Sequence, residues 1–298
     1  MKKIVIGITC LLCFIYMGGI AMSSPIAKSW VYATILIENE WGKGGTGFLV
    51  FRDTEPGKGR IFLCTNKHII NDSKALRDKA SKIICHINVK DKNGKIMGKD
   101  CEVKMSSLDG KKRWKEHPDA NVDVLAIDIT DVIEGIPEME KRWASYDLFV
   151  DDTILSKEDI AIGDEIMIVG YPKLYRQGEN NLPLVRQGII ATHIGQKYIE
   201  EDDQNGNIVR RVIRGFLIDG GVIHGSSGSP VILKPVSGRV VGNTTMLNPC
   251  QPYLLGIIAE TRFAPIKTDN GEKINSFAGL GLAFDASTVK ETIELFFN

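Results

Sequence analysis

Short segments rich in Val, Ile, Phe and Thr recur along the chain from about residue 30 onward, separated by Asn, Gly and Ser. β-Branched and aromatic residues favour strands, whereas Asn-Gly and Ser-Gly pairs favour turns. The pattern predicts strands at 30–37, 47–51, 61–65, 83–89, 122–129, 165–169, 188–191, 209–218, 230–233 and 254–259. Many short strands with few helices indicate an all-β barrel or sandwich.

The C-terminus shows the period of an amphipathic helix. Apolar residues at i, i+4 and i+7 fall on one helical face, at Val289, Ile293 and Phe296. Thr288 with Glu291 fits a capping box at the start of this helix. The charged stretch 130–161 lacks strand alternation, and we interpret it as a bridge between two halves with a short helix around 137–145.

The first residues are of a different kind. Two lysines precede an apolar run from Ile4 to Ile20, and small residues follow at Ala21 and Ser23. A charged start, an apolar run and a small-residue cleavage site are typical of a secretory signal peptide, here residues 1–23. An uncleaved anchor is the alternative, because the run is close to the minimum length that spans a bilayer. We expect a secreted or periplasmic protein with no membrane contact beyond this segment.

Charge narrows the classes of partner. Lys plus Arg equals Asp plus Glu at 37 each, so the formal net charge is zero. A nucleic-acid-binding protein usually carries a basic excess. We therefore expect no nucleic-acid partner.

Removal of the first 23 residues would leave four cysteines, at positions 64, 85, 101 and 250. In an oxidising compartment cysteines pair. Cys85 and Cys101 lie symmetrically about Asn93 in a hairpin-like stretch, so they are the one pair we would propose. The alternative is that they are buried small hydrophobes.

A serine between glycines is the first candidate for chemistry. Ser227 lies in Gly225-Ser226-Ser227-Gly228-Ser229-Pro230, directly before an apolar run. Flanking glycines let the backbone turn sharply and aim two N–H groups at one point. The alternative is a plain Gly/Ser turn.

A histidine and an aspartate complete the set. His68 ends an apolar strand, and Asp123 lies in another apolar stretch, where a carboxylate is costly unless a partner such as a histidine N–H pairs with it. Each also has a structural interpretation, since Asp123 could face outward, as Asp128 could. In the order His68, Asp123, Ser227 they predict a catalytic triad. An α/β-hydrolase is excluded because its histidine follows the serine, and none of the five histidines follows Ser227.

These motifs resemble those of trypsin-like (chymotrypsin-fold) serine proteases, closest to the bacterial high-temperature-requirement type. The matching segments run in order from about residue 30 to the C-terminus: Thr46-Gly47-Phe48-Leu49, Thr65-Asn66-Lys67-His68, Asp123-Val124-Leu125-Ala126, Ile162-Gly163-Asp164-Glu165, Gly170-Tyr171-Pro172, Gln187-Gly188-Ile189-Ile190 and Gly279-Leu280-Gly281-Leu282-Ala283-Phe284. The resemblance implies an all-β fold of two six-stranded antiparallel β-barrels with a C-terminal helix. Many bacterial relatives carry an appended peptide-binding (PDZ) domain, but only 14 residues follow Phe284 here, so we expect none. The first barrel would span 24–150 and carry His68 and Asp123, and the second would span 151–298 and carry Ser227.

The resemblance also assigns roles. Ser227 would be the nucleophile, His68 the general base and then acid, and Asp123 the group that orients His68. The N–H groups of Gly225 and Ser227 would form the oxyanion hole. Two segments would form the specificity pocket: Gly221, Val222, Ile223 and His224, and Ala259, Glu260 and Thr261.

The pocket residues suggest a preference. No acid stands at Gly221 to select Lys or Arg, and no histidine stands in 256–261 to select Glu. We expect an uncharged, small to medium apolar residue before the scissile bond. Glu260 would change this if it faced the pocket, but strand alternation relative to Ala259 predicts that it points outward.

Two residues depart from the family pattern. Ser226 stands where Asp or Asn is usual, and animal relatives are activated when a new N-terminal amine pairs with that Asp. We therefore expect activity without a new N-terminus. Ser229 replaces the commoner Gly.

Together these features predict a serine endopeptidase that cleaves protein or peptide substrates through an acyl-enzyme intermediate, with no cofactor and no metal. The alternatives are a catalytically inactive protease-like domain that binds peptides, and an esterase on the same fold. Inactive relatives usually lose a triad residue, and this chain keeps all three.

Overall fold

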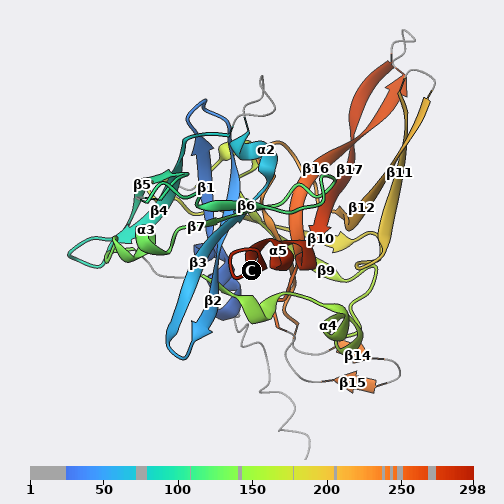
Figure 1. Cartoon of the computed structure of the whole chain (residues 1–298). Helices are drawn as coiled ribbons and strands as arrows, with labels where there is room; N and C mark the ends of the chain where they lie inside the picture. Colours follow the sequence, from blue (N-terminus) through green and yellow to red (C-terminus); the bar gives the residue numbers. More distant parts are fainter. Residues whose placement is uncertain are drawn as a thin grey trace, which may run out of the picture.

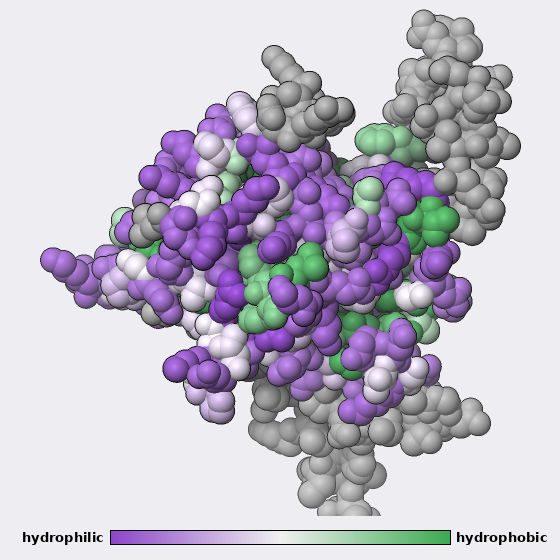
Figure 2. Space-filling view, viewed as in Figure 1, coloured by the Kyte–Doolittle hydropathy of each residue, from purple (hydrophilic) through white to green (hydrophobic). Residues whose placement is uncertain are grey.

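Two antiparallel sheets form most of this computed structural model, which describes residues 25–71, 79–107, 109–139, 143–176, 178–204, 207–236, 239–241, 244–246, 251–267 and 273–298 (Figure 1). The predicted signal segment and Cys250 lie outside these residues. Within them, no helix is both long and apolar enough to cross a membrane. The face seen in Figure 2 is mainly hydrophilic, with apolar side chains gathered in small patches.

The first sheet orders its strands β5-β4-β1-β2-β3-β7-β6, with β8 parallel beside β2. Their bounds are β1 (Thr34–Asn39), β2 (Gly44–Glu55), β3 (Lys58–Thr65), β4 (Lys82–Lys90), β5 (Ile96–Lys104), β6 (Trp114–Glu116), β7 (Leu125–Asp128) and β8 (Ala144–Ser145). The two ends of this strand order approach each other. The Arg113 N–H, next to β6, donates to Met105 O, next to β5, at 3.0 Å. The strand count of eight exceeds the six expected, since β6 and β8 are too short to show a side-chain pattern.

The second sheet is a closed ring. Its order is β10-β9-β13-β16-β17-β12, and β12 pairs back onto β10, while β11 lies outside the ring on β12. Their bounds are β9 (Glu165–Gly170), β10 (Leu184–Ile190), β11 (Lys197–Gln204), β12 (Asn207–Asp219), β13 (Pro230–Leu233), β16 (Leu254–Lys267) and β17 (Lys273–Asp285). A separate pair is formed by β14 (Arg239–Val241) and β15 (Thr244–Met246). The mostly-β fold with a six-stranded ring and a C-terminal helix is confirmed.

The boundary predicted at residue 150 falls in the segment between the two sheets, after β8 and before β9. The exact domain limits remain a prediction.

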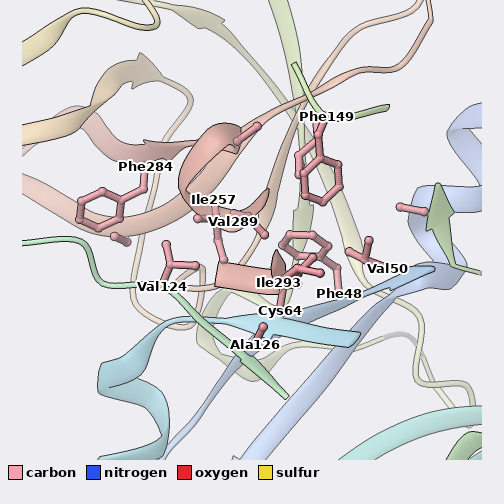
Figure 3. Packing of buried hydrophobic residues seen from close by; sticks show 14 of the residues in the cluster. Phe48, Val50, Cys64, Val124, Ala126, Phe149, Ile257, Phe284, Val289 and Ile293 are labelled. Atoms are coloured by element: carbon pink, nitrogen blue, oxygen red, sulfur yellow. The ribbon is translucent and has the colours of Figure 1, made fainter. Parts of the chain in front are cut away.

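A central hydrophobic cluster joins the two halves. Phe48 on β2 and Cys64 on β3 pack in one cluster with Ile257 on β16 and with two side chains of α5 (Ala286–Glu294), Val289 and Ile293 (Figure 3). All five side chains are fully buried. The predicted apolar face of the C-terminal helix is therefore the surface that closes the interface between the sheets.

The strand predicted at 30–37 is half wrong. Helix α1 (Pro25–Ala33) occupies its beginning, and β1 starts only at Thr34. Proline is well suited to the first position of a helix. Trp30 is fully buried, and its Nε1–H donates to Pro252 O at 2.9 Å. This distant contact explains why local propensity misleads here. Each of the other predicted strands overlaps an observed one.

The predicted helix starts also need correction. In the described part of 137–145 there is no helix; α3 (Thr130–Glu134) and α4 (Asp152–Lys157) lie on either side of it. The capping box is wrong as well. The helix α5 begins at Ala286, and the Thr288 hydroxyl donates back to Asp285 O at 2.6 Å. A Thr inside a first turn makes this backbone hydrogen bond instead of capping.

Cys85 lies directly opposite Cys101 in the β4–β5 register, as the hairpin symmetry suggested. The three described cysteines are nevertheless free thiols. Burial raises the pKa of Cys64 and Cys85, so both stay protonated near neutral pH. These two fit the alternative of buried small hydrophobes.

Asp285, at the N-cap of α5, should make stability depend on pH. It is 7% exposed, and burial raises its pKa to about 6, while hydrogen bonding from Gly195 opposes the shift. The folded chain therefore binds this proton more tightly than the unfolded chain, whose Asp pKa is about 3.9. The benefit is complete below about pH 4 and is lost as pH rises through 6.

We expect Asp285→Asn to raise the free energy of unfolding by about 2 kcal/mol at pH 8 and to leave it unchanged at pH 4. Urea denaturation at the two pH values measures this. Asp53→Asn, at an exposed position on β2, is the control. An equal change at both pH values for Asp285→Asn would contradict the role of its charge.

Candidate active site

The first sheet brings His68 and Asp123 together. Helix α2 (Lys67–Ile70) follows β3, and Asp123 stands two residues before β7, which pairs with β3. The His68 Nδ1 contacts Asp123 Oδ2, and the His68 backbone N–H donates to Asp123 Oδ1 at 3.1 Å. Asn66 Nδ2 donates to Asp123 O at 2.7 Å. The carboxylate thus holds both the ring and the backbone of His68.

The setting of Asp123 differs from the prediction in one respect. The sequence predicts a strand over 122–129, but β7 begins at Leu125, and the valines on either side of Asp123, at 122 and 124, are the buried residues. Asp123 therefore projects from the end of a loop toward α2. Asp128, which does lie in β7, pairs with Arg60 instead.

Two lysines that the sequence analysis did not single out lie near Asp123. Lys43 Nζ donates to His68 O, and Lys67 Nζ donates to His117 O at 2.9 Å. Burial lowers the pKa of each ammonium group, and the negative charge of Asp123 opposes that shift. Asp123 is thus placed among hydrogen-bond donors and two positively charged side chains.

The turn around Ser227 needs its glycines. Gly225 has φ +87° and Gly228 has φ +84°, in the left-handed region that other residues rarely adopt. A Cβ atom on Gly225 would lie 2.6 Å from Tyr171 O, and one on Gly228 would lie 1.8 Å from Thr46 O. Neither position has room for a side chain. The turn is therefore a tightly packed feature rather than a loose surface turn.

The backbone N–H groups of Gly225 and Ser227 are held in fixed directions. The peptide oxygen before Gly225 accepts from Lys173 N at 2.7 Å, and the oxygen before Ser227 accepts from Ser229 N at 2.9 Å. In a trans peptide the N–H points opposite to the C=O. Within the described chain neither N–H has a protein acceptor, whereas the Ser226 N–H between them donates to Ile223 O at 3.0 Å. Two fixed, unpaired donors on alternate residues are what an oxyanion hole requires.

The turn docks on the strand pair that leads to His68. Thr46 on β2 donates its N–H to Ser227 O at 2.9 Å and its hydroxyl to Gly225 O at 3.1 Å. Thr65, at the end of β3, donates to Thr46 O at 2.8 Å. Three residues later in the chain stands His68. The structure therefore brings the turn, the histidine and the aspartate to one junction between the sheets.

The Ser227 hydroxyl donates to Ala259 O at 3.1 Å and makes no hydrogen bond to His68, considering only described residues. A serine side chain has three staggered positions about its Cα–Cβ bond. Catalytic hydrogen bonds are often absent or long before substrate binds. In the observed rotamer the Ser227 hydroxyl therefore points to β16. Rotation about the Cα–Cβ bond would move it to either of the other two staggered positions.

The two predicted pocket segments meet across β17. A Cβ atom on Gly281 would lie 2.3 Å from Val222 Cγ2, and Gly281 is the register partner of Thr261 on β16. Val222 is 1% exposed and Ala259 is 4% exposed. Two other predicted residues contribute backbone oxygens. Ile223 O accepts from the Ser226 N–H, and His224 O accepts from the Lys173 N–H, while the His224 side chain is exposed. Val222 and Ala259 are thus buried apolar residues, and Val222 covers Gly281.

Glu260 has its charge engaged. A β-bulge between Ile258 and Glu260 interrupts the alternation on which the outward prediction relied. The carboxylate pairs with Arg211 and, at 2.8 Å, with Arg262. A substrate cation would have to compete with two arginines for this group.

Arg186 on β10 is a site residue that the sequence does not predict. Its Nη1 donates to Gly221 O at 2.6 Å, and its Nη2 donates to the Ser226 hydroxyl at 2.9 Å. Burial lowers the pKa of this guanidinium. Nothing in the sequence signals the contact, because it depends on how β10 lies beside a segment 35 residues away.

The sequence model of the trypsin-like peptidase domain matches residues 45–242, a span that includes His68, Asp123 and Ser227. The chain belongs to this family. No curated protein matches the sequence. As a trypsin-like peptidase domain, the chain is similar to a class whose substrates are proteins and peptides.

Solved structures with a similar course of the chain include proteases. The Rv3671c protease of M. tuberculosis in its inactive form is 16% identical, with 91% of this chain and 92% of that chain covered and a TM-score of 0.46. Its active form is 15% identical, with 90% and 82% covered and a TM-score of 0.46. HBP, solved at atomic resolution, is 10% identical, with 91% and 93% covered and a TM-score of 0.45.

No group of three or more His, Cys, Asp or Glu side chains that could hold a metal ion occurs in the described parts of this trypsin-like peptidase domain.

Proposed function

We propose that this trypsin-like peptidase domain is an active serine endopeptidase with His68, Asp123 and Ser227 as its triad. The observation that carries the proposal is the double contact of Asp123 with the ring and the backbone of His68. A carboxylate on Nδ1 keeps the proton there and leaves Nε2 as a base. The unpaired N–H groups of Gly225 and Ser227 add the second requirement, a site for negative charge.

The reaction then follows from these groups. The Ser227 hydroxyl rotates from Ala259 O, gives its proton to His68 Nε2 and attacks the peptide carbonyl carbon. The carbonyl oxygen becomes an oxyanion, which the N–H groups of Gly225 and Ser227 stabilise. His68 returns the proton to the leaving amine as the C–N bond breaks. Water, activated by His68, then hydrolyses the acyl-enzyme ester and restores Ser227.

The pocket supports a preference for a small, uncharged residue before the scissile bond. Val222 and Ala259 carry no charge, and Glu260 is already paired with Arg211 and Arg262. A site without a free charge favours uncharged residues, and an apolar site discriminates only weakly by size. Cleavage of a peptide library mainly after Ala, Val, Thr or Leu would agree with this, whereas strict cleavage after Lys or Arg would show that Glu260 recognises substrate.

Two finer parts of the proposal rest on the sequence. The resemblance to the high-temperature-requirement type is carried by the Thr65–His68 motif and by the Gly-Leu-Gly-Leu-Ala-Phe run that ends at Phe284. A secreted or periplasmic location is carried by the pattern of residues 1–23. N-terminal sequencing of the protein recovered from each cell fraction tests the location.

The competing function is a peptide-binding domain that does not cut. A peptidyl phosphonate that ends in Val separates the two, because only an activated serine forms the phosphonyl ester. We expect one equivalent of label per chain, on the peptide that contains Ser227. Unfolded protein is the control. Binding of the peptide without labelling would favour the inactive domain.

A further inference from the structure

A single cation reaches both ends of the segment from Gly221 to Ser226. Arg186 donates from Nη1 to Gly221 O at 2.6 Å and from Nη2 to the Ser226 hydroxyl at 2.9 Å. Its Nε atom is buried without an acceptor. Across the described chain no carboxylate lies within 4.0 Å of this guanidinium.

This arrangement costs free energy. A guanidinium that is partly removed from water and lacks a carboxylate loses hydration without gaining an ion pair. The lowered pKa of Arg186 has the same cause. An apolar or smaller side chain would avoid the cost, so stability alone does not account for an arginine here. What the arginine does provide is two rigid donors in one plane.

The path of the segment that it holds depends on the contacts that restrain it. Gly221 and Gly225 both have positive φ, +62° and +87°, and glycine crosses between backbone regions easily. The peptide group that ends in the Gly225 N–H lies between the two contacts of Arg186. The oxygen of this peptide group, His224 O, also accepts a hydrogen bond from the Lys173 N–H at 2.7 Å. Lys173 and Leu174 themselves have positive φ angles, 50° and 60°. A strained turn is a weak restraint unless its surroundings hold it.

We propose that Arg186 is a positioning residue, a built-in cation that clamps Gly221 and Ser226 and thereby holds the Gly225 N–H in the direction that catalysis needs. The inference rests on the proposed function. The inference also gives a reason why a new N-terminal amine is unnecessary. The position beside Ser226, where such an amine would bind in animal relatives, already holds the positive charge of Arg186. A second cation there would meet like-charge repulsion.

Arg186→Ala should therefore lower kcat about 10²-fold and change KM little, because a misdirected oxyanion donor affects the transition state more than substrate binding. Added guanidinium ion, far below denaturing concentration, should restore part of the activity of this variant and none in the wild type. Amide hydrogen exchange across 221–229 should become faster, with the exchange of β13 unchanged.

Gln187→Ala is the matched control. Gln187 is the next residue on β10 and lines the same surface hollow, but its side chain bonds to Glu165 and not to the turn. This variant should keep the wild-type kcat and exchange. Wild-type kcat and exchange in Arg186→Ala would overturn the proposal. So would a loss of activity that follows a lower Tm and does not respond to guanidinium.

A second measurement does not depend on activity. Ser226→Asp would give Arg186 the carboxylate that it lacks, so it should raise Tm by about 3 °C in the wild type and lower it in the Arg186→Ala background. The same sign in both backgrounds would overturn the clamp. If the wild type cleaves nothing, the proposed function fails, while exchange and this coupling still decide whether Arg186 holds the turn.

Discussion

Replacing Ser227 with alanine should abolish peptidase activity, with a loss of about 10⁴–10⁶ in kcat and no loss of stability. The Ser227 hydroxyl bonds only to Ala259 O among the described residues, whereas the Ser226 hydroxyl accepts from Arg186 and the Ser229 hydroxyl is buried. Its one hydrogen bond, to Ala259 O, is replaceable by water because the serine is partly exposed. Initial rates on an internally quenched peptide and a thermal melt measure the two expectations.

Ser229→Ala is the control for this result. Ser229 lies two residues later in the same turn, and its buried hydroxyl has no hydrogen-bond partner among the residues that the structure describes. Its removal should leave both activity and Tm close to the wild type. Full activity in Ser227→Ala together with inactivity in Ser229→Ala would show that Ser227 is not the nucleophile.

Asp123→Asn should lower kcat by about 10⁴ while leaving KM nearly unchanged. The contacts of Asp123 explain why the loss is so large. An asparagine would still accept the His68 backbone N–H with its amide oxygen at the place of Oδ1. Its NH₂ group would then face Nδ1 and donate to it, which moves the ring proton to Nε2. A ring protonated at Nε2 cannot take the proton of Ser227.

The matched variant is Asp119→Asn, four residues earlier in the same loop. The Asp119 carboxylate accepts from the Asn121 N–H at 2.9 Å and does not contact His68. It should keep the wild-type kcat. A silent Asp123→Asn beside an inactive Asp119→Asn would refute the assignment of the orienting carboxylate.

The sequence is a good guide to the parts of the site that are local. The glycines beside Ser227 are required by a backbone conformation and by contacts that begin at the turn itself, so the pattern identifies them. His68 and Asp123 follow from a family motif and from the cost of a carboxylate among valines. The six-stranded ring follows from the family resemblance, although its closing pair, β10 with β12, is a long-range contact.

The parts that escaped prediction depend on contacts between distant residues. In the sequence Arg186 is an ordinary strand residue, and only the structure shows that β10 lies beside Gly221. Trp30 lies in helix α1 although the composition around it is typical of a strand. Its indole N–H donates to the backbone oxygen of Pro252, 222 residues away. Strand β17 contains glycines that weaken strand propensity, yet Gly281 is needed because Val222 fills the space above it. Local pattern carries no information on such pairings.

Thr46 has a consequence for how activity arises during folding. It belongs to the first sheet, yet it bonds to Gly225 and Ser227 of the second half, and Tyr171 N–H donates to its hydroxyl at 3.0 Å. Contacts so far apart in sequence form late, after each half has gained its own structure. The N–H groups of Gly225 and Ser227 and the ring of His68 therefore come together only when the two halves have docked. Under the proposed function, a chain with one folded half would be inert and would not digest its own unfolded copies.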